Sequence, residues 1–143
     1  HLKSKGFGTP AQSNARRKQQ AERLYQIYQA LRQTQELVAV VGDLNDTPDS
    51  DPLSPLKGSD LQDVSTHPNY RNDGFPGTYG SGSANNKIDY ILLSPALYAK
   101  VTAAGVNRRG VWTGSRQWEM LPQLQAAAEA ASDHAAIWVD LDL

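Results

Sequence analysis

Two polar side chains follow a short apolar run near the middle of the chain, in the stretch L-V-A-V-V-G-D-L-N-D-T-P at 37–48. The run at 37–41 is rich in β-branched residues, which indicates a short strand buried on both faces. After Gly42, Asp43 and Asn45 stand two positions apart, so an extended backbone places both side chains on one side. Open α/β sheets bind ligands at the carboxyl ends of such strands, although Asp and Asn also favour a solvated turn.

A second carboxylate interrupts an apolar strand pattern, K-I-D-Y-I-L-L-S at 87–94. Alternation along the strand places Asp89 on the same face as Lys87 and Ile91. A carboxylate within an apolar strand costs on the order of several kcal/mol unless it is paired or hydrogen-bonded. Asp89 therefore requires a partner, and Lys87 or a backbone amide is the simplest candidate.

A third polar group, Ser132-Asp133-His134, directly precedes the alternating segment A-A-I-W-V-D-L-D-L at 135–143. The alternation predicts a terminal strand. Ser-Asp-His before a strand is by itself typical of a turn. Because all three polar insertions stand at the ends of predicted strands, they form a candidate site if those ends converge.

The composition limits the class of protein. The 143 residues suit one domain spanning 1–143, and a formal charge of −1 gives no overall electrostatic footprint for nucleic acid. Basic residues cluster at 16–18 and 108–109, which is compatible with either a solvated face or a phosphate contact. The absence of cysteine excludes disulfides, thiolate metal sites and a cysteine nucleophile. No apolar run approaches a membrane span, and no signal peptide is visible.

The remaining pattern predicts an α/β fold. A helix is expected at 15–33, capped by Ser13 or Asn14, with a core-facing stripe of Leu24, Ile27, Tyr28 and Leu31. The other expected elements are a short helical turn within 49–61, a long loop at 67–82, a strand at 99–106 and a short helix or irregular loop at 117–131.

The order and spacing of these motifs together are far more specific than any one of them. The chain resembles the carboxy-terminal half of the endonuclease/exonuclease/phosphatase superfamily, which includes pancreatic-type deoxyribonucleases, apurinic endonucleases, neutral sphingomyelinases and inositol polyphosphate phosphatases. The resemblance spans nearly the whole chain. It rests on H-L-K-S-K at 1–5, G-D-L-N-D-T-P at 42–48, K-I-D-Y-I-L at 87–92 and S-D-H at 132–134.

The resemblance implies a role for each matching residue. His134 is similar to the family's histidine at the scissile phosphate, and Asp89 is similar to the carboxylate that orients this histidine. Asp43 resembles the residue that activates or positions the attacking water, and Asn45 resembles the amide that holds phosphate or water. His1 matches a histidine that contacts phosphate. On this interpretation, the partner that Asp89 requires is His134.

The resemblance also implies a metal site and a substrate surface. Asp133 and Asp43 are similar to residues at the family's metal position, which would take Mg²⁺ or Mn²⁺. Hydrolysis of a phosphodiester needs a positioned water, a base and positive charge on the phosphoryl oxygens. The residues expected to contact substrate are Asn45, Lys3, Arg108 and Arg109.

The implied fold is half of a four-layer α/β sandwich, with one mixed sheet and a helix on one face. Complete family members pack two similar halves sheet to sheet, and their first half carries a glutamate that is the principal metal ligand. No matching segment is present, and the chain begins with His1 rather than Met, as a processed product or a fragment does. The fragment alone is therefore expected to be inactive, and its uncovered sheet to bind the missing amino-terminal half or a second copy.

The family resemblance leaves the substrate open. A metal-dependent nuclease is the favoured interpretation, because N-R-R-G-V-W at 107–112 places cations beside an aromatic side chain. The alternatives are a phosphoinositide or sphingomyelin phosphohydrolase fragment, or a non-catalytic module that binds through the exposed sheet. A cysteine-free bacterial-type nuclease would suit secretion or the periplasm.

Overall fold

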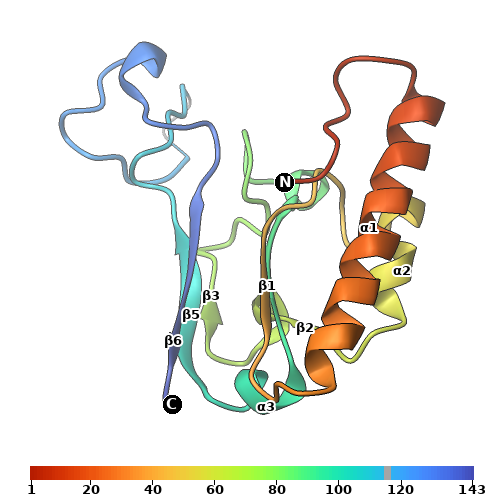
Figure 1. Cartoon of the computed structure of the whole chain (residues 1–143). Helices are drawn as coiled ribbons and strands as arrows, with labels where there is room; N and C mark the ends of the chain where they lie inside the picture. The colour runs from red at the N-terminus through yellow and green to blue at the C-terminus, as the bar shows by residue number, and fades with distance from the viewer. Residues whose placement is uncertain (115–116) are drawn as a thin grey trace.

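The structure, a computed structural model, describes residues 1–114 and 117–143 and confirms the predicted α/β class. A long helix lies along one side of a layer of strands, and an extended loop region projects beyond the strands at the end where the chain begins (Figure 1). The helices are α1 (Pro10–Arg32), α2 (Ser54–Lys57) and α3 (Pro95–Tyr98). The strands are β1 (Ala39–Asp43), β2 (Gln62–Asp63), β3 (Tyr70–Arg71), β4 (Asp89–Leu93), β5 (Val101–Asn107) and β6 (Ala136–Leu141).

The strands form two three-stranded sheets where one mixed sheet was expected. The first sheet has the order β1-β4-β2 and is antiparallel, and the second has the order β3-β5-β6 with β3 parallel to β5. One apolar cluster joins them, because Leu93 of β4 packs with Val101 and Ala104 of β5. In the first sheet Asp43 stands directly opposite Asp89, so the register of β1 and β4 brings two candidate site residues together.

The predicted irregular segments are largely confirmed. The region 49–61 contains a 3₁₀ turn, Asp51–Leu53, that continues into α2. The region 67–82 is a loop interrupted by the two residues of β3 and by an isolated bridge at Tyr79. Within the described part of 117–131, the one regular element is the 3₁₀ turn Ala127–Glu129. Among the described residues, no helix is both long enough and apolar enough to cross a bilayer.

Helix α1 begins earlier than predicted and is rotated relative to the predicted stripe. Thr9 is the N-cap, because its side chain accepts from the Gln12 amide, and the Gln12 side chain accepts from the Thr9 amide in return. Ile27 and Leu31, predicted to face the core, are largely exposed. The buried face of α1 consists of Ser13, Arg17, Ala21 and Tyr28. Its polar members are hydrogen-bonded, which is why a stripe of apolar spacing alone did not identify this face.

Strand β1 is covered on one face only, contrary to the prediction that it is buried on both. Leu24 and Tyr25 of α1 pack with Val40 against the cluster that contains Tyr90 and Leu92. On the opposite face, the Val41 side chain is 66% exposed. The reason is that α1 covers a single face, and no described segment covers the other face of β1.

A buried arginine attaches α1 to the two segments that lead into the candidate site. Arg17 is fully buried and donates two hydrogen bonds to Asp46 Oδ2, at 3.0 Å and 2.7 Å. Its remaining donors reach the Lys3 carbonyl at 2.8 Å and Asn14 Oδ1 at 2.6 Å. Lys5 pairs with the other oxygen of the same carboxylate at 2.9 Å. One guanidinium therefore fixes both the 1–5 segment and the residue that follows Asn45.

Replacing the acid of this pair is expected to destabilise the fold in a pH-dependent way. Asp46→Asn leaves a buried guanidinium without its counter-charge, which costs about 3–5 kcal/mol. Burial acts to raise the pKa of Asp46, but hydrogen bonds from Lys5, Arg17 and the Thr47 amide outweigh it, and the pKa lies below its usual 3.8. The stabilisation is therefore present above about pH 4 and is lost as pH falls through the lowered pKa.

Thermal unfolding of the wild-type chain and of Asp46→Asn, measured from neutral pH down to acid, checks this prediction. The two melting temperatures should converge as the pH falls. Asp51→Asn is the matched control, because its carboxylate is exposed and pairs with exposed Lys18, so its effect should stay within about 0.5 kcal/mol. Equal melting temperatures for wild type and Asp46→Asn at neutral pH would contradict the role of the pair.

Candidate active site

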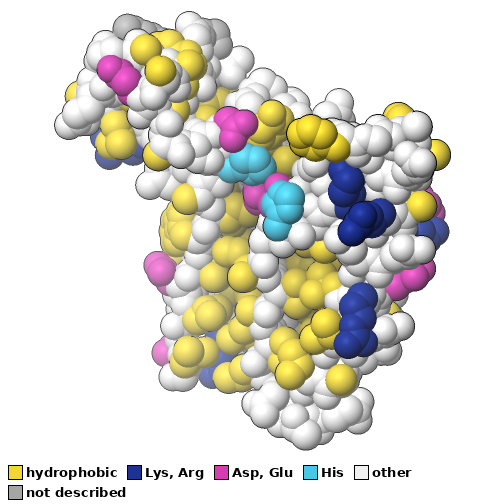
Figure 2. Space-filling view, turned by 45° about the horizontal axis from the view of Figure 1, so that its top comes forward, with side chains coloured by type: hydrophobic (Ala, Val, Ile, Leu, Met, Phe, Trp, Pro, Cys, Tyr) yellow, Lys and Arg dark blue, Asp and Glu magenta, His cyan; other side chains and the backbone are white. Residues whose placement is uncertain are grey.

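The polar ends of β1, β4 and the segment before β6 converge on one open pocket of about 470 Å³. Figure 2 shows histidine and acidic side chains side by side at one end of the face, above a broad hydrophobic area and beside a group of Lys and Arg side chains. The predicted site residues that line the pocket are His1, Asp43, Asn45, Asp133 and His134.

His134 and Asp89 form a hydrogen-bonded pair, as predicted. His134 Nδ1 lies 2.9 Å from Asp89 Oδ2 and 3.1 Å from Asp89 Oδ1. The backbone sets this approach, because Tyr79 and His134 form an isolated antiparallel bridge and Ala135 donates to the Thr78 carbonyl at 2.7 Å. Since Nδ1 is engaged by the carboxylate, Nε2 is the nitrogen left for a ligand in the pocket.

Thr78 is hydrogen-bonded to the Asp89 carboxylate. The sequence did not identify it as a site residue. Its hydroxyl donates to Asp89 Oδ2 at 2.6 Å and accepts from the Asp89 and Ile88 amides at 3.1 Å and 3.3 Å. Thr78 is buried, so these bonds form away from solvent. The partly buried carboxylate thus has two side-chain partners, Thr78 and His134, which offset the cost of its partial removal from water.

Lys87, the alternative partner for Asp89, is placed differently. Its ammonium group donates to the Asp89 main-chain carbonyl at 2.7 Å and pairs with the Asp63 carboxylate at 3.1 Å. It also lies 3.6 Å from the centroid of the Tyr90 ring. Burial lowers the pKa of Lys87, and the neighbouring Asp63 partly counteracts this effect. Lys87 therefore supports the backbone of Asp89 and leaves its carboxylate to His134.

On the opposite side of the pocket, Asp43, Asn45 and His1 form a second hydrogen-bonded group. The Asp43 carboxylate accepts from the Asn45 amide at 2.7 Å and from Asn45 Nδ2 at 2.9 Å. His1 Nε2 lies 3.2 Å from Asn45 Nδ2 and 3.4 Å from Asp43 Oδ2. The backbone turns sharply here, with φ of 147° at Gly42 and 56° at Asn45. Glycine and asparagine tolerate these values, which explains both residue types in G-D-x-N.

The carboxylates across the pocket create an unfavourable concentration of negative charge. Burial raises the pKa of Asp43, and the nearby Asp89 raises it further, against the Asn45 hydrogen bond and His134. Ligand atoms of Asp43, Asp89 and His134 all lie within 4.8 Å of one another, as they would around a metal ion. Carboxylate oxygens suit hard divalent cations, so the Asp43 carboxylate fits such a cation, while Asp89 and His134 are already hydrogen-bonded to each other.

Asp133, the other expected metal ligand, borders the pocket but stands apart from this cluster. Its side chain is 72% exposed, and its Oδ1 lies 4.0 Å from His134 Nε2. The described groups that could together hold a metal ion include Asp43 but not Asp133. The structure therefore places Asp133 at the rim, on the Nε2 side of His134.

Three residues expected to contact substrate have other partners. Arg108 is 5% exposed and donates to the carbonyls of Asn72, Phe75 and Gly77, so its predicted phosphate contact is replaced by a structural role. Arg109 is exposed, outside the pocket, and pairs with Glu119 at 3.1 Å. Lys3 lies beside the pocket, and its ammonium group donates to the carbonyls of Ser4 and Gly6.

Some residues that shape the site carried little signal in the sequence. Thr78 lies in a loop rich in Gly and Asn, where no periodicity identifies a buried hydroxyl. Arg17 belongs to a basic cluster at 16–18 that is typical of a solvated face, although it is fully buried. Asp46 follows Asn45 within the recognised motif. Its burial, which requires a nearby cation, is visible only in the structure.

The His134–Asp89 geometry makes a prediction about the histidine tautomer. When the ring is neutral, its proton should reside on Nδ1, because Asp89 is the acceptor there. Asp89→Ala removes that acceptor and should shift the tautomer equilibrium toward Nε2–H, as nitrogen NMR of the ring would report. Asp133→Ala is the matched control and should leave the tautomer unchanged. An unaltered tautomer in Asp89→Ala would contradict the pairing.

Comparison with known proteins is consistent with this geometry. No curated protein sequence matches the chain. Among solved structures, a 3′ phosphatase from Neisseria, NExo, bound to a product DNA hairpin, superimposes with a TM-score of 0.62 at 16% identity. The match covers 99% of this chain and 57% of that protein, so this chain spans little more than half of its neighbour's length. At that identity the likeness shows a shared fold.

The sequence supplies the family. Members of the Endonuclease/Exonuclease/phosphatase family hydrolyse phosphodiesters or phosphate esters and are generally dependent on divalent metals. The family's sequence profile matches residues 5–134, nearly the full length of the chain. The match includes every predicted catalytic residue except His1. The chain therefore belongs to the Endonuclease/Exonuclease/phosphatase family.

Proposed function

We propose that this chain contributes one half of the active site of a metal-dependent phosphodiesterase that acts on nucleic acid. The observation that carries this proposal is the convergence of the His134–Asp89 pair with Asp43, Asn45 and His1 around one open pocket. Such an arrangement offers an oriented imidazole, a carboxylate and an amide to the same ligand. These are the groups that phosphodiester hydrolysis requires, apart from a source of strong positive charge.

Each residue has a specific task in this proposal. Asp89 orients His134 so that Nε2 addresses the phosphoryl group, and in the doubly protonated imidazolium form Nε2–H donates to an oxygen that gains charge in the transition state. Asp43 positions the attacking water and accepts its proton. Asn45 and His1 hold the phosphate or the water from the other side of the pocket.

The positive charge would come from Mg²⁺ or Mn²⁺ held by Asp43, with Asp133 approaching from the rim. Magnesium prefers oxygen ligands, so a bound ion would take carboxylates and leave His134 with Asp89. A divalent cation there would neutralise the phosphoryl oxygens and lower the pKa of a bound water. It would also relieve the repulsion between Asp43 and Asp89 across β1 and β4.

A nucleic acid substrate is favoured over a phosphoinositide or sphingomyelin. The solved neighbour with the same fold is described as bound to DNA. The pocket is open and polar, with Asn85, Asn86 and Lys5 on its wall, and so has room for an extended backbone. The cations of N-R-R-G-V-W no longer support this preference, because Arg108 is buried and Arg109 is paired with Glu119.

The exposed face of β1 is proposed to bind the amino-terminal half of a complete domain or, without it, a second copy of the chain. Alternation places Leu37, Ala39 and Val41 on this face, and all three are exposed. Ile91, opposite Val41 in the register, is also incompletely buried. A continuous apolar surface of this kind is typical of an interface. The match to only 57% of the neighbour supports a partner of comparable size.

The activity prediction has two parts. The 143-residue chain alone should hydrolyse a fluorogenic oligonucleotide negligibly with Mg²⁺. The acidic side chains that its described residues bring to the pocket are aspartates, and the glutamate expected as the principal metal ligand is not among them. A longer protein that joins this chain to an amino-terminal half should cleave the same substrate. In that protein His134→Ala should lower kcat by about 10²–10³, the effect of losing one preorganised electrostatic group.

His67→Ala is the matched control for the histidine substitution, since His67 lies outside the pocket and packs against Tyr98. It should leave kcat unchanged. Strong, His134-dependent cleavage by the 143-residue chain alone would contradict the half-site proposal. Cleavage by the longer protein that survives His134→Ala would contradict the catalytic assignment.

The interface prediction concerns the exposed face of β1. The chain should self-associate and bind a hydrophobic dye, because covering apolar surface contributes about 25 cal/mol per Å². Val41→Lys introduces a charge at the centre of this face and should reduce both effects in light scattering and dye fluorescence. Ile27→Lys, on the exposed side of α1, is the control and should reduce neither. A dye-free, monodisperse wild-type monomer would show that this face needs no partner.

A further inference from the structure

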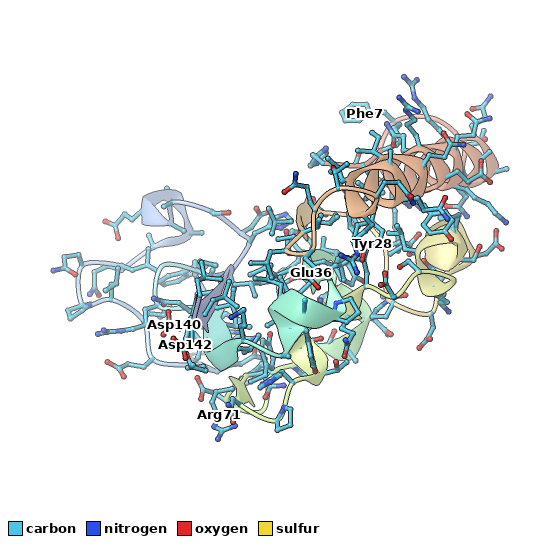
Figure 3. The ribbon with its side chains drawn as sticks, turned by 60° about the horizontal axis from the view of Figure 1, so that its bottom comes forward. Phe7, Tyr28, Glu36, Arg71, Asp140 and Asp142 are labelled. Carbon is cyan, nitrogen blue, oxygen red and sulfur yellow. The ribbon has the colours of Figure 1, made fainter. Side chains whose placement is uncertain are left out.

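Phe7 is the most exposed large apolar side chain among the described residues, with 93% of its surface accessible. Its ring stands clear of the body of the chain, beyond the start of α1 (Figure 3). Exposure of a phenyl ring forgoes the stabilisation that burial of its apolar surface would contribute. A single exposed apolar residue is common, so the ring acquires meaning only from the loop that carries it.

The loop is built to hold this ring outward. Phe7 has a φ of 63°, a left-handed conformation that is unfavourable for a bulky residue and is followed by Gly8 at 100°. The loop is fastened on both sides of the ring. Buried Ser13 donates to the Phe7 carbonyl at 3.4 Å, and the Lys3 ammonium group donates to the carbonyls of Ser4 and Gly6. The backbone is therefore tied down while the side chain stays free.

The same loop forms one wall of the candidate active site. Ser4, Lys5 and Gly6 line the pocket that contains His134 and Asp43, and Phe7 is the next residue along the chain. The Lys5 ammonium group is more than half exposed on that wall. An aromatic ring thus projects from the loop that forms one wall of the candidate pocket, two residues after a solvent-accessible cation.

We propose that Phe7 is a stacking platform for a base of single-stranded nucleic acid whose phosphodiester lies in the pocket. This inference rests on the proposed function and adds a residue that recognises the bases, a task that none of the roles proposed above for His134, Asp43 and Asn45 includes. Aromatic stacking is tolerant of sequence, and a neighbouring cation follows the backbone. Phe7 and Lys5 therefore suit a strand bound without base-specific hydrogen bonds.

A lipid surface is a less suitable occupant for this loop. Insertion into a membrane interface requires an apolar face of several residues beside a strongly basic face. Phe7 is instead flanked by Gly6 and Gly8, so no second apolar side chain stands beside it in the loop. One ring between two glycines can stack on a single base but offers little surface to acyl chains.

Binding of two labelled strands to the 143-residue chain tests the proposal. One strand is oligothymidylate of about ten nucleotides, and the other is an abasic sugar-phosphate strand of the same length, both measured by fluorescence anisotropy in Ca²⁺ to prevent cleavage. Phe7→Ala should weaken binding of oligothymidylate about 5- to 100-fold and leave binding of the abasic strand unchanged. Phe7→Trp should restore the affinity. Leu143→Ala, an exposed apolar residue at the far end of the chain, is the matched control and should change neither.

The two strands separate failure of this inference from failure of the proposed function. Equal affinity of wild type and Phe7→Ala for oligothymidylate would overturn the stacking role while the proposed function stands. A wild-type chain that binds neither strand would overturn this inference, whereas failure of the longer protein to cleave an oligonucleotide would overturn the proposed function. Loss of binding to phosphatidylserine vesicles in Phe7→Ala, with oligothymidylate binding intact, would assign the ring to membranes and overturn the proposal.

Discussion

The candidate site depends on the burial of one positive charge. Arg17 lies in the buried face of α1, and a guanidinium removed from water is tolerated only when its donors are satisfied. Asp46 and the Lys3 carbonyl supply those acceptors, so the helix determines where two separate segments of chain must lie. Asn45 directly precedes Asp46, and His1 lies in the same 1–5 segment as Lys3. A change in the position of α1 would therefore move one side of the pocket relative to the other.

The other side of the pocket is positioned by a separate set of contacts. Thr78 ties the loop before β4 to the Asp89 carboxylate, and the bridge between Tyr79 and His134 brings the start of β6 to the same place. Asp43 and Asp89 meet across the register of β1 and β4. The fold thus holds two carboxylates closer together than their own charges favour, and the pKa of Asp43 is raised by burial first and by the nearby Asp89 to a smaller extent. Such a cost to stability is typical of a functional site.

The sequence allowed the principal convergence to be predicted because strand alternation is a strong local constraint. Asp89 in an apolar strand demanded a partner, and the family resemblance identified it as His134. The helical stripe failed at Ile27 and Leu31, because the buried face of α1 is formed partly by polar residues whose partners are distant in sequence. Arg17 depends on residues 29 positions away, which no periodicity encodes.

Arg108 illustrates the same limit in a loop. Its sequence context, cations beside an aromatic, is chemically appropriate for nucleic acid. The fold of residues 72–77 instead presents three carbonyls to its guanidinium, and burial of Arg108 keeps it from contact with a substrate. Local composition specifies what a side chain can bind, whereas the path of a distant loop decides what it does bind. Phe7 is the converse case, because the role proposed for it depends on a loop conformation that no sequence motif predicts.

The exposed face of β1 and the polar pocket share a boundary, and this proximity connects assembly to chemistry. Val41 lies two residues before Asp43, so a body that covers Val41 would also exclude water from part of the pocket. Electrostatic interactions strengthen as water is removed, and the repulsion between Asp43 and Asp89 would grow with them. The covered site would then bind a divalent cation more strongly than the open one. On this argument, completing the sheet contact would prepare the pocket for metal as well as supply further ligands.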